Sequence, residues 1–234
     1  MIDVPTVTAE QMREIDRIAV EDLHLELAQM MENAGRNLAD LALRRFRPES
    51  VAVLSGRGGN GGGGLVAARH LANRGVSVSV TLSHASGELS PVTAHQLDIT
   101  NRMGIPAGTS PGPATLVIDA LIGYSLQGNP AGRTAALIAW ANDQPSPILA
   151  LDVPSGLDAT TGRAATPCIR AAATLTLALP KAGLVDSPEA GALFLADISI
   201  PPDAYGRLGL SVPPLFETET TIALGPDDEH LPRT

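Results

Sequence analysis

One segment, Val51 to Leu71, constrains the fold of this 234-residue chain more than any other. An apolar run, Val51 to Leu54, precedes seven glycines among the nine residues Gly56 to Gly64, and a stretch of helical composition then ends at Leu71. That order predicts a strand, a tight loop and a helix. Glycine costs conformational entropy on folding, so this many in one loop indicate that a ligand approaches the main chain there, with an anion at the N-terminus of the following helix.

The rest of the chain alternates helical and extended patterns. Two helices are expected before the first strand: Thr8 is the predicted N-cap of one, with Gln11 completing a capping box, and the other spans about 28–46. Further strands are expected at 76–82, 115–118, 148–151, 174–179, 193–198 and 220–224, and further helices at 90–103 and 133–140. This alternation predicts a single α/β domain over residues 1–234, with a mostly parallel sheet and helices on both faces.

Composition excludes several classes of protein. A net charge of −9 argues against a nucleic-acid binder, whose affinity comes from Lys and Arg on phosphates. The sequence contains no apolar run near the ~20 residues that span a bilayer, and its N-terminus lacks the pattern of a signal peptide. Cys168 is the only cysteine, which rules out an internal disulfide and fits a reducing compartment. We therefore expect a cytoplasmic protein with no membrane partner.

Ligands of parallel α/β sheets bind at the carboxyl ends of the strands. Four segments of glycine, polar or charged residues follow predicted strands, namely Gly56–Gly64, Asp119–Asn129, Asp152–Asp158 and Pro180–Gly183. Their convergence on one edge predicts the functional site more strongly than any one of them does.

Three common motifs fit this site poorly. The segment starting at Gly56 matches G-x-G-x-x-G, but the strand expected at 76–82 lacks the acidic residue at its end that holds a ribose in dehydrogenases. A phosphate-binding P-loop needs Lys and Ser or Thr where Leu65 and Val66 stand. Ser155 lacks the preceding glycine of a hydrolase nucleophile elbow, so its hydroxyl is more consistent with a ligand or a turn cap.

Carboxylates at the ends of buried strands point to function. Asp119 and Asp152 each end an apolar strand, and such groups are costly to desolvate unless they are paired, metal-bound or catalytic. Asn60, Asp119 and Ser155 together offer hard oxygen donors that suit a weakly bound monovalent or divalent cation better than zinc. Lys181 can reach an anionic ligand, although a solvated surface lysine is the more common case. The five histidines show no metal-ligand spacing.

Several spaced motifs, taken in order, resemble the NAD(P)H-hydrate epimerases, the family of the YjeF N-terminal domain. The segment 30–35 is similar to the family's L-M-E-N-A-G, and 56–71 resembles G-x-G-N-N-G-G-D-G-L-V-A-A-R-H-L. The segments 117–128 and 151–162 are similar to V-D-A-L-F-G-x-G-x-x-G and D-I-P-S-G-L-D-x-x-T-G. Pro180-Lys181 and 195–198 fit two later signatures, so the resemblance covers nearly the whole chain.

The resemblance implies a Rossmann-like three-layer α/β/α fold, often dimeric, so we expect a homodimer. It implies an isomerase that interconverts the R and S forms of hydrated NADH and NADPH, with a separate NAD(P)H-hydrate dehydratase repairing the S form. It also implies a potassium ion on Asn60, Asp119 and Ser155. The residues that it implies as substrate-binding are Gly59, Asn60, Gly61, Gly62, Gly63, Gly123, Tyr124, Ser125, Leu126, Gln127, Gly128, Asn129 and Asp152.

Epimerisation at C6 of the nicotinamide ring requires a group that protonates and deprotonates the departing oxygen, and Asp152 is the candidate. The chain departs from the family pattern at two positions, where Gly59 and Gly63 replace an asparagine and an aspartate. These replacements leave open an alternative, a non-catalytic nucleotide-binding or regulatory module on the same fold. A third interpretation, an oxidoreductase using intact NAD, is disfavoured by the missing ribose acid.

Overall fold

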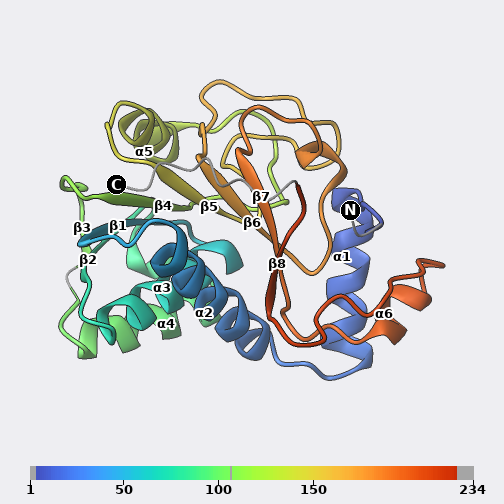
Figure 1. The fold of residues 1–234 in the computed structure, drawn as a ribbon. Coiled ribbons are helices and arrows are strands. Elements are labelled where there is room, and N and C mark those ends of the chain that lie inside the picture. The colour runs from blue at the N-terminus through green and yellow to red at the C-terminus, as the bar shows by residue number, and fades with distance from the viewer. Residues whose placement is uncertain (1–3, 106, 226–234) are drawn as a thin grey trace.

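A computed structural model describes residues 4–105 and 107–225 of the chain. Its centre is an eight-stranded sheet with the order β3-β2-β1-β4-β5-β6-β7-β8, in which every pair of neighbours is parallel except β7 and β8 (Figure 1). The strands are β1 (Ser50–Ser55), β2 (Ser77–Leu82), β3 (Ala107–Gly108), β4 (Leu116–Ala120), β5 (Ile148–Leu151), β6 (Ala173–Leu177), β7 (Ala192–Ala196) and β8 (Thr221–Ala223). The direction of strand order reverses between β1 and β4, the position where ligands of such sheets bind.

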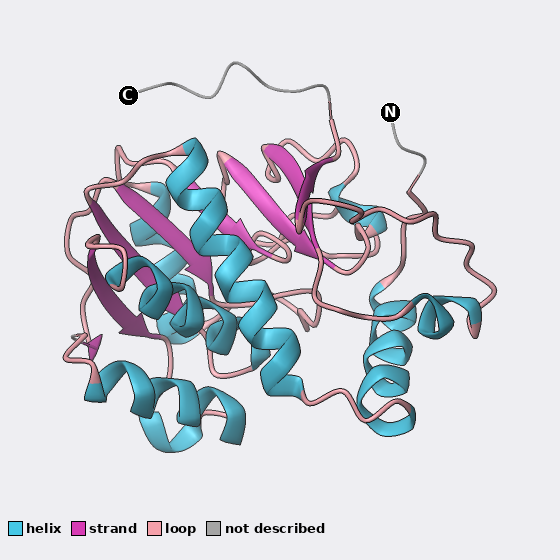
Figure 2. Cartoon of the chain, turned by 60° about the horizontal axis from the view of Figure 1, so that its bottom comes forward, coloured by secondary structure: helices cyan, strands magenta, loops and turns pink. Residues whose placement is uncertain are grey.

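Helices cover both faces of the sheet (Figures 1 and 2). The helices are α1 (Ala9–Arg17), α2 (Leu27–Arg45), α3 (Gly59–Ala72), α4 (Pro91–Arg102), α5 (Gly132–Asn142) and α6 (Pro202–Gly206). Figure 1 shows α2, α3 and α4 on one face and α5 on the other. The predicted α/β fold with a mostly parallel sheet and two leading helices is therefore confirmed.

The core follows from the alternation of side chains along the buried strands. In β4, Leu116 and Ile118 join the apolar cluster beneath α2, α3 and α4, whereas Val117 joins the cluster beneath α5. In β5, Leu149 and Ala150 divide between the same two clusters. Because both faces are covered, these strands are apolar throughout and place their polar residues only where they end.

Helix α1 lies apart from both layers, at the carboxyl edge of the sheet (Figure 1). Thr8 caps it with the predicted capping box to Gln11, and Met12 and Ile15 are buried. A π-helical turn, Ile18–Asp22, continues it. The apolar face of this unit packs with Leu179, which follows β6, and Ile198, which follows β7. The first helix thus forms part of the edge where the predicted site lies.

The sequence-based boundaries differ from the structure in a few places. The two-residue edge strand β3 and the short helix α6 were not predicted, since neither carries a periodic apolar pattern of useful length. The predicted edge strand at 220–224 is present as β8. The sequence also predicts a frayed acidic tail over 225–234, and residues 226–234 of it lie outside the described residues. Within the described ranges, no helix is both long and apolar enough to cross a membrane.

Candidate functional site

A cavity of about 280 Å³ opens at the carboxyl edge of the sheet, close to the lower end of the ~300–1,000 Å³ typical of small-molecule pockets. Its polar wall brings together residues from five segments of the chain, namely Asp16, Gly59, Asn60, Gly63, Gly123, Tyr124, Ser125, Asp152 and Lys181. The remaining wall is apolar and consists of Met12, Leu27, Met30, Met31, Ala34, Leu151, Leu177 and Ile198. Each of the four segments predicted to converge there contributes at least one residue.

The glycine-rich segment is the start of a helix rather than a loop, which corrects the sequence-based boundary. Helix α3 begins at Gly59, directly after Gly58 as its N-cap. A Cβ atom at Gly62 would lie 2.4 Å from the sulfur of Met31, and one at Gly64 would lie 2.5 Å from the Cβ of Ala120. These glycines allow the helix to pack closely on α2 and β4, so protein contact rather than ligand contact accounts for part of the glycine run.

Asp152 and Lys181 form a buried ion pair in the cavity wall. The Lys181 side chain is 1% exposed and that of Asp152 is 5% exposed. Lys181 Nζ donates to Asp152 Oδ1, to the carbonyl oxygen of Leu177 at 2.8 Å and to Thr176 Oγ1 at 3.4 Å. Because these three acceptors use all three ammonium protons, Lys181 holds Asp152 in place rather than reaching a ligand. The more common case that the sequence analysis named for Lys181, a solvated surface lysine, does not hold here.

The second oxygen of Asp152 organises the loop after β4. Tyr124 N donates to Asp152 Oδ2 at 2.9 Å. A Cβ atom at Gly123 would lie 2.8 Å from Asp152 Oδ2 and 3.3 Å from Asn60 Oδ1, so the loop passes closely between those two side chains. Asp152 itself has a φ of +68°, a left-handed conformation that is uncommon outside glycine and that turns its carboxylate into the cavity wall.

Asp119 and Ser155 contact each other where β4 and β5 end. Asp119 is fully buried at the end of β4 and accepts from Ser155 Oγ at 2.6 Å, Ser155 N at 2.8 Å and Leu121 N at 3.2 Å. These donors are all neutral, and desolvation raises the pKa of the Asp119 carboxyl to about 6. Ser155 Oγ also accepts from Ile122 N at 2.8 Å, which ties this pair to the loop after β4.

Asn60 completes the predicted ligand set from the first turn of α3. Asn60 lines the cavity beside Gly123 and Asp152. Asp119 and Ser155 are completely buried and are not among the residues that line the cavity. The side-chain nitrogen of Asn60 is buried and, among the described residues, has no hydrogen-bond partner. A buried amide with an open position is suited to a ligand, and its oxygen and nitrogen are interchangeable by rotation of the amide.

Asp16 belongs to the site although the sequence analysis did not identify it. It lies on α1, half-buried in the cavity wall, and Tyr124 Oη donates to its Oδ2 at 2.6 Å. Desolvation raises the pKa of this carboxyl. The available signal was its position: Asp16 is four residues after Met12 and next to Ile15, so a carboxylate stands on the apolar face of an amphipathic helix.

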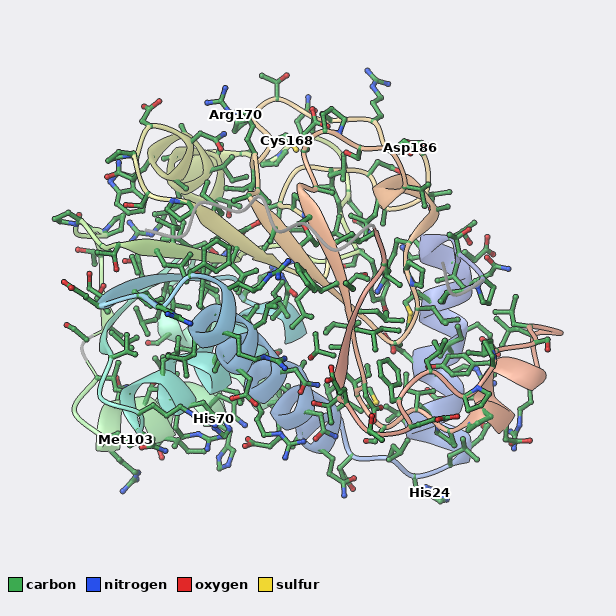
Figure 3. The ribbon with its side chains drawn as sticks, in the orientation of Figure 1. His24, His70, Met103, Cys168, Arg170 and Asp186 are labelled. Atoms are coloured by element: carbon green, nitrogen blue, oxygen red, sulfur yellow. The ribbon has the colours of Figure 1, made fainter. Side chains whose placement is uncertain are left out.

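The described histidines and the single cysteine lie elsewhere. Figure 3 shows His24 and His70 well apart on the helical side of the molecule, with Cys168 across the sheet from them. His70 bonds Glu32 of α2 through its Nε2 at 2.8 Å, which makes it a contact between helices. Among residues 4–105 and 107–225, no group of three or more His, Cys, Asp or Glu side chains is arranged to hold a metal ion.

A protein-family model described as "YjeF-related protein N-terminus" matches residues 27–183, which include α2, the glycine-rich start of α3, Asp119, Asp152, Ser155 and Lys181. The chain belongs to this family. The resemblance stated from the motifs is thereby confirmed.

Individual relatives agree with this assignment. A Dehalogenimonas lykanthroporepellens protein named NAD(P)H-hydrate epimerase is 49% identical over 88% of this chain and 87% of its own length. A Moorella thermoacetica protein named bifunctional NAD(P)H-hydrate repair enzyme Nnr is 38% identical over 83% of this chain, which matches 40% of that longer protein. The crystal structure of yeast ynu0 superposes with a TM-score of 0.84 over 94% of this chain and all of its own, at 24% identity, and so supports the fold.

The structure places the substrate-binding residues predicted for this YjeF-family chain in two groups. Gly59, Asn60, Gly63, Gly123, Tyr124, Ser125 and Asp152 line the cavity. Gly61 and Gly62 are buried in the packing of α3, and 126–129 continue the loop beyond the cavity wall as described. For both groups, contact with the substrate remains a prediction.

The two departures from the family motif lie at the cavity. A Cβ atom at Gly59 would meet nothing within 4 Å, and one at Gly63 would lie 2.8 Å from the tip of the Leu151 side chain. Neither position requires glycine for close packing against backbone. The cavity wall therefore lacks two side chains that the family pattern supplies, and it retains the Asp152–Lys181 pair, Asp16 and Tyr124.

Proposed function

We propose that this chain is an NAD(P)H-hydrate epimerase, an isomerase that interconverts the R and S forms of hydrated NADH and NADPH. The observation that carries the proposal is its 49% identity, over most of both chains, to a protein of that name. The cavity at the strand reversal supports it, because it holds a buried carboxylate beside the N-terminus of α3. These relatives favour an epimerase over the alternative of a non-catalytic nucleotide-binding module.

Two parts of the substrate are proposed to contact different parts of the cavity wall. The exposed N–H groups at the start of α3, around Gly59 and Asn60, suit the pyrophosphate of the hydrated cofactor. The altered nicotinamide ring then lies toward Asp152 and the apolar side chains of Met30 and Leu151. The residues proposed to bind it are those predicted from the resemblance, with the seven in the cavity wall making the closest approach.

In the reaction, the lone pair on the ring nitrogen expels the C6 hydroxyl and leaves an iminium. Water then adds to the other face of the ring. Asp152 is proposed to give a proton to the departing hydroxyl, which leaves as water, and to take a proton back from the water that adds, since its carboxyl group is held in the wall by Lys181 and by Tyr124 N. The hydrogen bond from Lys181 fixes the position of this carboxylate in the wall.

Asp152→Asn should lower the rate of epimerisation by about 100-fold or more, the usual contribution of a positioned acid or base. The measurement starts from one purified epimer of hydrated NADH and follows the appearance of the other by chromatography. Asp98→Asn, which removes an exposed carboxylate of α4, is the matched control and should keep the wild-type rate. A fully active Asp152→Asn protein would remove Asp152 from this role. A wild-type protein that does not accelerate the interconversion would refute the proposed function.

We propose that Asn60, Asp119 and Ser155 hold one potassium ion. Asp119 is a buried carboxylate whose hydrogen-bond donors are neutral, and Asn60 has an open position on its side-chain amide, so the donor set fits a cation with oxygen ligands. The ion would neutralise Asp119 and hold the loop after β4, which carries Gly123 and Tyr124, in its position beside Asp152.

Potassium should therefore stabilise the protein independently of activity. At about ten times its Kd, the ion should raise the Tm by roughly 3–6 °C relative to tetramethylammonium chloride at equal ionic strength. The effect should be larger at pH 7.5 than at pH 5. The pKa of Asp119 in the folded protein, about 6, lies above the ordinary value of 3.8 for this carboxyl group, so without a cation the stability falls as pH rises through that interval. Equal Tm values in both salts, or a potassium effect that survives Asp119→Asn, would contradict this site.

The remaining partners are proposals of the same kind. The product is proposed to pass to an NAD(P)H-hydrate dehydratase on a separate chain, and the protein is proposed to be a cytoplasmic homodimer. Burial raises the pKa of the Cys168 thiol to about 12, so little of it is the reactive thiolate at neutral pH. Light scattering coupled to size-exclusion chromatography measures the oligomeric state directly.

A further inference from the structure

The cavity wall contains a second carboxylate, Asp16, which has no role in the reaction proposed above. It is contributed by α1, whereas Asp152 follows β5, so two distant parts of the chain supply the two acids of one wall. Both contact Tyr124: the backbone nitrogen of Tyr124 donates to Asp152 Oδ2, and its hydroxyl donates to Asp16 Oδ2. The two carboxylates therefore contact opposite ends of one tyrosine, and both line the cavity.

The two carboxylates have different surroundings. Asp152 accepts a charge-assisted hydrogen bond from the ammonium group of Lys181. Asp16 instead accepts a hydrogen bond from the neutral Tyr124 hydroxyl, and burial raises the pKa of its carboxyl, which favours the protonated form. Paired acids whose environments differ in this way are the usual arrangement for one proton donor and one proton acceptor.

We propose that Asp16 is a second catalytic acid–base group, acting on the opposite face of the nicotinamide ring from Asp152. This inference rests on the proposed epimerase function and adds to it. An epimerase must remove an oxygen from one face and return it to the other, and a single carboxylate fixed by Lys181 reaches only one of them. Asp16, held at the other end of Tyr124 in the same cavity wall, supplies the group for the other face.

The proton and electron balance closes with these two groups. Asp16 gives its proton to the C6 hydroxyl, the carbon–oxygen bond breaks with its electron pair leaving on water, and the ring nitrogen donates its lone pair to form the iminium. Water adds to the other face while Asp152 takes its proton, and the nitrogen recovers its lone pair. The enzyme then holds the proton on Asp152 instead of Asp16, which is the form that converts the other epimer by the same steps in reverse.

The charged and titratable groups around Asp16 come from several elements. They are Tyr124 and Asp152 from the loops after β4 and β5, Lys181 after β6, Tyr205 of α6 and, beside Tyr124, Arg13 of α1 itself. Substitution of Asp16 is therefore tested by chemical rescue rather than by a pH profile alone, because the neighbouring groups titrate too.

The test uses Asp16→Asn and Asp16→Ala in the full chain, with interconversion measured from each purified epimer of hydrated NADH. Both variants should lose about 100-fold or more in kcat while KM changes by less than about threefold. Acetate buffer should restore part of the Asp16→Ala rate, in proportion to its concentration, because the small acid occupies the vacated position. Glu10→Gln, an exposed carboxylate in the first turn of the same helix, should match the wild type.

The outcomes separate the two proposals. If the wild type epimerises and Asp16→Asn keeps its kcat, Asp16 is not an acid–base group and the epimerase function stands. If Asp16→Ala is slow, well folded by circular dichroism and unresponsive to acetate at every concentration tested, Asp16 acts structurally and the inference is overturned. A wild type without activity on either epimer would overturn both proposals.

Discussion

Replacing Lys181 with methionine should lower the free energy of unfolding by about 3–5 kcal/mol, the cost of leaving a buried carboxylate without its counter-ion. Lys181 and Asp152 are almost completely buried, and the lysine also satisfies the carbonyl of Leu177. Methionine fills a similar length with an apolar chain, so the main change is the loss of charge and hydrogen bonds rather than a cavity. Urea unfolding followed by circular dichroism measures the difference.

Two further variants make this result specific. Adding Asp152→Asn to Lys181→Met removes the unpaired charge and keeps an acceptor for Tyr124 N, so about 2 kcal/mol or more should return. Epimerisation should stay lost in the double variant, because the proposed acid–base group is gone. Arg102→Met breaks the exposed pair with Asp98 and should change stability by less than about 1 kcal/mol. A Lys181→Met protein as stable as the wild type would show that the pair is not needed to keep the site folded.

The location of the site could be predicted because it depends on topology. Asp119 and Asp152 stand where apolar strands end, and parallel strands bring such positions to one edge. The burial of Lys181 depends instead on a contact with the N-terminal segment, since Val7 bridges to Lys181 beside the end of β6. A lysine after a proline is normally solvated, and nothing local in the sequence signals that distant segment.

Asp16 was missed for a related reason. The apolar period of the first helix indicates which face is buried, but it does not indicate what that face packs against. The structure places α1 at the carboxyl edge of the sheet, where Met12 and Asp16 join the cavity wall. The first helix thus provides a titratable group to the site. Only the tertiary arrangement connects it with Tyr124.

The glycine run was interpreted too simply because composition does not distinguish a bare loop from a tightly packed helix. At Gly61, a Cβ atom would lie 2.0 Å from the carbonyl oxygen of Gly56, which is backbone and cannot rotate away. At Gly59, two residues earlier in the same helix, a Cβ atom would meet nothing within 4 Å. Close packing therefore requires glycine at Gly61 but not at Gly59, and only the structure distinguishes these two neighbouring positions.

Gly61→Ala should consequently destabilise the protein by about 3 kcal/mol, at the upper end of the usual cost of overpacking, because β1 and α3 must move apart. Gly59→Ala, the same substitution in the same turn, should leave stability unchanged or raise it by about 0.5–1 kcal/mol, the helical preference of alanine over glycine. Urea unfolding of both variants gives the comparison. Equal losses would mean that the whole glycine run is kept for a backbone conformation or a ligand, and that the packing of α3 on the end of β1 is not the reason for Gly61.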